Sequence, residues 1–354
     1  MSARSRRIAL SLYGIARSHI GRALTGLLTH SIQARQSAVP VPVSAMLPPI
    51  SLHERQTADV SIAVLTNAPD SVILHFIRTN LRLGVRHVHI YLDAAQCSDT
   101  LDAMRGDTVS VHCCDDAFWA QSDAGVRSPF VEARQSEAYR HAYERCATAW
   151  IGFCDIDEFF VPKADFRTLF DATPEDIEMH VATTWEAVWG PGHTGYGDFS
   201  ANLCRRAIWN EGRRKWLRHN RPFYTSFTGN GICGHSEGKA LVRAGIPDCI
   251  PGIHRAFRLV EDERRPLKLL ETQINLLHYD AISYHQWKDK FLQRRKPDGK
   301  MGGQSYWRRA LTDLLYLGKG EDFRLALFKE LYGAEGDYMD WMQQHDFVRR
   351  IVTP

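Results

Sequence analysis

Three acidic side chains follow a strongly apolar stretch in WIGFCDIDEFFVP, residues 150–162. Asp155, Asp157 and Glu158 come directly after the apolar run 150–154. Because ionised carboxylates are costly to bury without a partner, the cluster predicts a cation at the end of a buried strand. Carboxylates at positions i and i+2 can converge on one divalent ion, and oxygen ligands suit Mg²⁺ or Mn²⁺. The alternative is an acidic strand end paired with lysine or arginine.

The segments that must position this cluster alternate between strand and helix patterns. Apolar or alternating runs predict strands at 60–66, 87–93, 108–114 and the start of 150–162. Helical spacing predicts helices at 71–84, 98–106 and 128–146. This alternation favours a parallel sheet with right-handed crossovers, in which ligands bind beyond the carboxyl ends of the strands. We therefore expect Thr66, Asn67 and Asp93, which fall at such ends, to hold the base and ribose of a nucleotide.

The second half of the sequence is less regular. Strand patterns occur at 178–189, 239–244 and 274–280, a glycine-rich loop covers 189–199, and the chain looks helical from about 283. We divide the chain into a basic N-terminal segment with a proline-rich linker (1–50), an α/β domain (51–296) and a helical C-terminal extension (297–354).

Several motifs occur in the order found in one enzyme family. They are LGVRHVHIYLDAAQCSDT, WIGFCDIDEFFVP, TTWEAVWGPGHTG, GKALVRA, GIHR and LLHYDAISYHQWKDKFLQR, spread over about 60–296. With them the chain resembles glycosyltransferase family 2 relatives and is similar to glycosyltransferase family 92 proteins. The resemblance implies an α/β, GT-A-like nucleotide-binding sandwich with a mainly parallel central sheet. It also implies metal-dependent transfer of a sugar, expected to be inverting, from a uridine-linked nucleotide sugar to a glycan or related acceptor.

The same resemblance implies roles for single residues. Asp157 would ligate Mn²⁺ or Mg²⁺ directly, Asp155 would contact the metal, its bound water or the ribose, and His278 would ligate the metal or a phosphate. Three more residues would lie near the donor: Arg134, Gln135 and Lys239. A histidine packed in the core, and solvated side chains at the other three positions, are the alternatives.

One motif departs from the family pattern. Relatives carry Lys-Asn-Glu after the first strand, whereas this chain has Thr66-Asn67-Ala68, which puts the usual donor contacts there in doubt. The basic residues Lys290, Arg294 and Arg295 match positions near the donor phosphates, but an exposed helix face is the preferred interpretation. This departure keeps open an inactive glycan- or partner-binding module as the alternative function, with a DxD phosphohydrolase less favoured.

An inverting transfer needs a general base that deprotonates the acceptor hydroxyl. Glu186, Glu237 and Asp198 are candidates by position, and exposed loop acids without a catalytic role are the alternative for each. The segment 211–219, EGRRKWLRH, carries four basic residues that could face an acidic acceptor or lipid head groups. A solvated basic loop is the simpler interpretation.

The composition narrows the cellular setting. A formal charge of +3 in 354 residues does not indicate nucleic-acid binding. The eight cysteines lack zinc-ligand spacing, so we expect them to be reduced and buried in a cytoplasmic protein. No apolar run is long enough to span a membrane. Residues 1–53 hold six arginines and no acid, interleaved with aliphatic residues, which favours peripheral contact with an anionic membrane or a disordered basic tail.

We predict that a protein starting near Ser51 loses binding to anionic vesicles and keeps sugar transfer to a soluble acceptor. Each basic residue near an anionic bilayer contributes about 1 kcal/mol, and this attraction weakens with salt. Co-sedimentation with vesicles at low and high salt, beside a donor-hydrolysis assay, measures both properties. Sedimentation of the shortened protein with the vesicles would contradict the assignment.

Overall fold

One mixed sheet of eleven strands organises the part of the chain that the computed structural model describes, residues 47–353 without 123, 229, 294–305 and 319. Its strands are β1 Leu47–Ser51, β2 Ala58–Thr66, β3 Val85–Leu92, β4 Val109–Cys113, β5 Trp150–Phe153, β6 Glu158–Pro162, β7 Met179–Val188, β8 Leu203–Arg206, β9 Ala240–Arg243, β13 Leu269–His278 and β14 Val348–Val352. A small second sheet holds β10 Cys249–Ile250, β11 Phe257–Val260 and β12 Glu263–Pro266. The described helices are α2 Asp70–Arg82, α3 Asp99–Asp102, α4 Asp116–Trp119, α5 Val131–Glu144, α6 Phe166–Asp171, α7 Glu211–Asn220, α8 Pro222–Thr225, α9 Tyr284–Gln293, α10 Tyr306–Leu317, α11 Glu321–Tyr332 and α12 Gly336–Gln344.

The first part of the sheet is parallel, in the order β4-β3-β2-β5. Alternate residues of β2 point to opposite faces. Val60, Ile62 and Val64 pack in the same cluster as the buried face of α2, whereas Ala63 and Leu65 join the cluster that holds the buried face of α5. Helices therefore cover both faces, and the α/β class expected from the sequence is confirmed.

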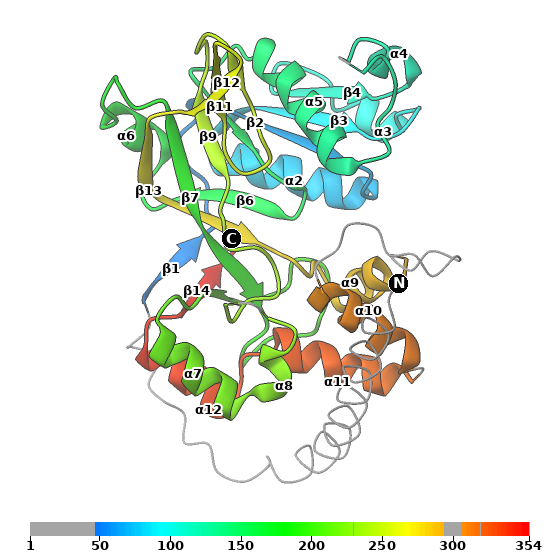
Figure 1. Cartoon of the computed structure of the whole chain (residues 1–354), viewed down its shortest axis with the longest axis vertical. Coiled ribbons are helices and arrows are strands. Elements are labelled where there is room, and N and C mark those ends of the chain that lie inside the picture. Colours follow the sequence, from blue (N-terminus) through cyan, green and yellow to red (C-terminus); the bar gives the residue numbers. More distant parts are fainter. Residues whose placement is uncertain (1–46, 123, 229, 294–305, 319, 354) are drawn as a thin grey trace, which may run out of the picture.

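Antiparallel strands extend this sheet. β9 pairs antiparallel with β5 and β7, and β7 pairs antiparallel with β8. In Figure 1 the long strand β7 runs from the upper, parallel part of the molecule down toward α8 and α11, and β13 leads toward α9. The two parts therefore share strands and a continuous core.

The acidic motif occupies a turn between two strands. After β5 the chain passes Asp155 and Asp157 and reverses into β6, which pairs antiparallel with β13. β13 also pairs with β7, so His278 lies opposite Glu158 on one side and Glu186 on the other. Residues in register across neighbouring strands point to the same face, so these three side chains gather there.

Both ends of the described chain enter the sheet. β14 pairs with β8 and with β1, so the helical segment after 297 ends in a strand, and the segment before Ser51 contributes one. A protein that starts near Ser51 would therefore lack β1, and the truncation that tests the N-terminal segment should remove only residues before Leu47. The six arginines themselves lie outside the described residues, and membrane contact stays a prediction. Within the described residues, no helix combines the length and apolar character that a membrane span needs.

One pair of cysteines differs from the expectation that all eight are reduced. Cys97 and Cys113 form a disulfide, with Cα atoms 5.9 Å apart. Cys113 ends β4, and Cys97 lies in the loop after β3, the strand beside it. The pairing of β3 with β4 thus brings together two thiols that are 16 residues apart, which sequence spacing did not reveal.

We predict that reduction of this disulfide lowers the free energy of unfolding. Closing a loop of this length stabilises the folded state by about 3 kcal/mol in the chain-entropy model. The melting temperature should fall when dithiothreitol is added, and Cys97→Ser should reproduce the fall while making the protein insensitive to the reductant. An unchanged melting curve in both cases would contradict the pairing.

Candidate functional site

A buried lysine lies beneath the acidic turn. The Nζ of Lys239, at the start of β9, lies 3.0 Å from Asp155 Oδ2 and 3.5 Å from Glu158 Oε2, and its side chain is fully buried. Burial alone would lower the pKa of Lys239, but the charges of Glu158 and Asp155 raise it above its ordinary value. The lysine is therefore a permanent cation that compensates two of the three acids.

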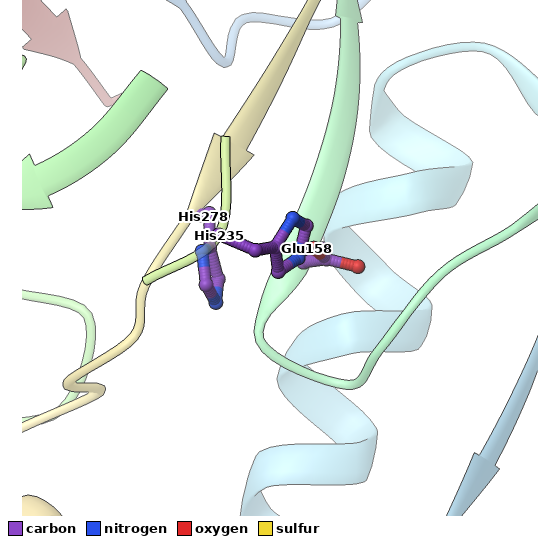
Figure 2. A group of neighbouring side chains, drawn as sticks. All are labelled: Glu158, His235 and His278. Carbon is purple, nitrogen blue, oxygen red and sulfur yellow. Dashed lines mark hydrogen bonds and ion pairs between the residues drawn. The ribbon is translucent and has the colours of Figure 1, made fainter. Parts of the chain in front are cut away.

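Glu158 connects this lysine with two histidines. Its Oε2 also accepts a hydrogen bond from the backbone N–H of Asp155, and its Oε1 lies 2.7 Å from His235 Nε2. Burial opposes ionisation of Glu158, yet Lys239 and His235 hold its pKa well below the ordinary value. Figure 2 shows His235 and His278 beside Glu158, and single ligand atoms of the three residues lie within 4.8 Å of one another.

Asp157 is placed differently from Glu158. Its Oδ1 lies 4.0 Å from His278 Nε2, and its Oδ2 lies 3.4 Å from Lys290 Nζ on α9. Lys290 also donates to the carbonyl of Asp280, a buried acid that Arg308 and Tyr332 hold by further hydrogen bonds. Lys290 thus faces the site instead of lying on an exposed helix face, the interpretation preferred from sequence.

A divalent ion fits between Asp157 and His278. Ligand bonds of about 2.1 Å can span an oxygen and a nitrogen that are 4.0 Å apart. Both oxygens of Asp155 are engaged by Gln135 and Lys239, and both oxygens of Glu158 have hydrogen-bond partners. Asp157 therefore keeps the most available carboxylate oxygen, beside a buried imidazole. A second possible set of metal ligands shares His278 with this pair and consists of Glu158, His235 and His278.

The first turns of α5 connect the ends of β3 and β5. Arg134 pairs with Asp93 Oδ2 at 2.9 Å, and the next residue, Gln135, donates to Asp155 Oδ1 at 2.6 Å. Arg127 takes the other oxygen of Asp93. The donor-side residues expected from sequence thus form one connected edge, although Arg134 already has an acid partner. Thr66 is buried and caps the N–H of Ala68, and Asn67 beside it is exposed.

The three candidate bases lie in different environments. Glu186 is fully buried: its Oε2 pairs with Arg205, and its Oε1 accepts from the N–H groups of Cys233 and Gly234. It holds the loop before His235 and is not free to meet an acceptor. Glu237 is 70% exposed, with its Oε2 3.8 Å from His254 Nε2. Asp198 is exposed in the loop between β7 and β8.

Sequence reasoning missed His235 and the inward position of Glu158. The motif GHSEGK could have indicated His235, because this histidine lies four residues before Lys239, which the family resemblance places near the donor. The contact with Glu158 spans 77 residues, however, and no local pattern indicates it.

Comparisons with known proteins give structural likenesses. No family model matches the chain, and no curated protein matches it significantly. Among solved structures, the chain is similar to glucosyl-3-phosphoglycerate synthase from Mycobacterium tuberculosis with Mn²⁺ and UDP, at 14% identity and a TM-score of 0.25 over 53% of this chain and 57% of that one. It is similar to GalNAc-T7 with UDP, GalNAc and Mn²⁺, at 11% identity and a TM-score of 0.33. This match covers 82% of this chain and 57% of that one. A third similar structure is HddC from Yersinia pseudotuberculosis, at 10% identity and a TM-score of 0.28. The match covers 62% of this chain and 92% of that one. The chain spans less than two thirds of the length of the first two, and the activity has to be argued from the site.

We predict that Glu186→Gln destabilises the protein by about 3–5 kcal/mol, the usual effect of leaving a buried charge without its partner. Arg205 would keep its positive charge inside the fold. The double variant Glu186→Gln with Arg205→Met should recover much of the loss, because it removes the unpaired charge as well. Urea unfolding curves of the three proteins measure the difference. A stable Glu186→Gln protein that lacks activity would instead support the catalytic role.

Proposed function

We propose that this chain is a metal-dependent glycosyltransferase that moves a sugar from a nucleotide-sugar donor to a glycan or related acceptor. The observation that carries the proposal is the pairing of Asp157 with His278 beside a buried lysine, at the carboxyl end of the parallel strands. This is the edge where a sheet of this class binds its ligands. A divalent ion held there would neutralise the charge that develops on the nucleoside diphosphate leaving group.

The other residues of this edge fit the donor in a defined order. Asp155, fixed by Gln135 and Lys239, is one-third exposed and presents its remaining lone pairs toward a ribose or a metal-bound water. Asp93, with Arg127 and Arg134, follows β3, which is separated from β5 by β2, and this position suits the nucleoside. Lys290 supplies a positive charge beside Asp157 for the diphosphate. We favour a uridine-linked donor, as the family resemblance implies.

We assign the general base to Glu237 in an inverting transfer. It is the exposed acid in the loop that carries His235, so an acceptor hydroxyl can approach it. Glu186 is excluded from this role in the proposal by its buried pair with Arg205.

The metal preference follows from the ligand chemistry. Mg²⁺ demands near-ideal octahedral oxygen coordination, whereas Mn²⁺, as a transition-metal ion, accepts an imidazole nitrogen such as that of His278 beside oxygen ligands more readily. We therefore favour Mn²⁺ over Mg²⁺ as the cofactor.

Two alternatives are less well supported. A DxD phosphohydrolase would need Asp155 as a nucleophile, but Gln135 and Lys239 occupy both of its oxygens. An inactive binding module would not need an acid such as Asp157 kept available beside a histidine. Release of nucleotide from a panel of nucleotide sugars, with and without Mn²⁺, separates the enzyme from the module.

We predict that Asp157→Asn lowers turnover by at least about 100-fold, the scale of losing one preorganised charge-stabilising group. The variant keeps the size of the side chain, so the melting curve should change little. Asp289→Asn, which removes the same charge from an exposed position on α9, is the control and should keep full activity. Unchanged turnover and Mn²⁺ dependence in Asp157→Asn would overturn the assignment.

A further inference from the structure

A pocket of about 280 Å³ lies next to the loop that carries His235. Its walls include Arg206, Trp209, Asn210, Arg213, Ser236 and Phe347. Ser236 directly follows His235, and consecutive Cα atoms are only about 3.8 Å apart, so one loop contributes to both the pocket and the histidine cluster. The volume suits a small polar group with one sugar ring, because pockets for larger ligands begin at roughly 300 Å³.

Three arginines at or beside this pocket have no acidic partner among the described residues. Arg206 stacks over the rings of Trp185 and Phe347, Arg213 over Phe347, and Arg349 over Trp185, at 4.3–5.7 Å from the ring centroids. None of the three forms an ion pair with a carboxylate among the described residues. The buried Nε atoms of Arg206 and Arg349 also lack a hydrogen-bond partner there.

Two neighbouring arginines of β8 differ in whether an acid pairs with them. Arg205 and Arg206 are neighbours and point to opposite faces of the strand. Arg205 is fully buried and neutralised by Glu186. On the other face, burial lowers the pKa of Arg349, and the nearby charge of Arg206 adds to that effect. The fold thus brings positive charges together, and no carboxylate in the described part of the chain pairs with them.

Planar guanidinium groups held against aromatic rings can bind carboxylate or phosphate through paired hydrogen bonds. Trp209, 64% exposed at the wall of the pocket, offers an apolar face on which a sugar ring can stack. We infer that this pocket binds an anionic sugar, carrying a phosphate or a carboxylate that Arg206 and Arg213 recognise, at a site separate from the histidine cluster. This inference goes beyond the proposed glycosyl transfer, and binding of the anionic sugar is tested separately.

Three probes that share one ring isolate the anion: glucose, glucuronate and glucose 6-phosphate. Each is titrated into the full chain by calorimetry, with UDP and Mn²⁺ present and again without them. We expect both anionic sugars to bind at least tenfold more tightly than glucose, and the stronger of the two identifies the recognised group. Equal affinity for all three, or displacement of glucose 6-phosphate by UDP, would overturn the inference, because displacement would make the pocket a part of the donor site.

Variants then locate the binding. Arg206→Gln and Arg213→Gln should each weaken binding of the anionic sugar by about 10- to 100-fold, since hydrogen bonds to charged groups contribute about 1.5–3 kcal/mol. Arg218→Gln is the matched control: it removes the same charge from α7, but Arg218 is half-exposed and paired with Glu211. Trp209→Ala should weaken the binding of glucose 6-phosphate and leave the binding of inorganic phosphate unchanged. Equal losses in Arg213→Gln and Arg218→Gln would indicate a general charge effect and contradict a built site.

Failure of this inference is distinguishable from failure of the proposed function. Binding of UDP with Mn²⁺ reports on the donor site alone, so a protein that binds UDP but not the anionic sugars retains the proposed function and loses only the anionic-sugar site. A protein that binds glucose 6-phosphate through Arg206 but not UDP keeps the pocket and loses the transfer reaction.

Discussion

The ammonium group of Lys239, buried between Asp155 and Glu158, is the interaction on which the site depends. Its position is set by the entry of the chain into β9. Gly238 has a φ of +73°, and a Cβ atom there would lie 2.1 Å from the carbonyl oxygen of Ala182. Only glycine lets the backbone come this close to β7 before Lys239 turns inward. With the lysine in place, Glu158 can stay ionised away from bulk water, and Oδ1 of Asp157 remains available for a ligand.

A second buried pair supports the first. Glu186 and Arg205 are both fully buried, and Glu186 also holds the N–H groups of Cys233 and Gly234, just before His235. Arg205 donates to the carbonyl of Leu331, which ties the C-terminal helices to the same point. Buried ion pairs contribute little net stability because desolvation offsets their attraction. Their value here is positional: breaking either pair would move the loop that carries the histidine.

The sequence predicted the parallel half of the fold, because its signals are local. The alternation in β2 and the helical faces of α2 and α5 can be recognised within single segments, and the DxD motif marks its own strand end. The other features depend on contacts between distant segments. His235 contacts Glu158, Lys290 contacts Asp157, and Cys97 bonds to Cys113, and in each case the partner lies elsewhere in the sequence. Glu186 looked like a surface acid because nothing near it in sequence shows that Arg205 will cover it.

The acidic turn and the arginine pocket differ in how they are assembled. The acids follow β5 and Lys239 directly precedes β9, and these two strands are neighbours in the sheet. The pocket arginines come from β8 and α7, and the ring of Phe347 that they share comes from the C-terminal segment just before β14. The pocket is therefore complete only when the C-terminal segment has joined β8. Binding at the arginine pocket therefore depends on docking of the C-terminal segment, whereas the acidic turn is organised mainly by the strands around it.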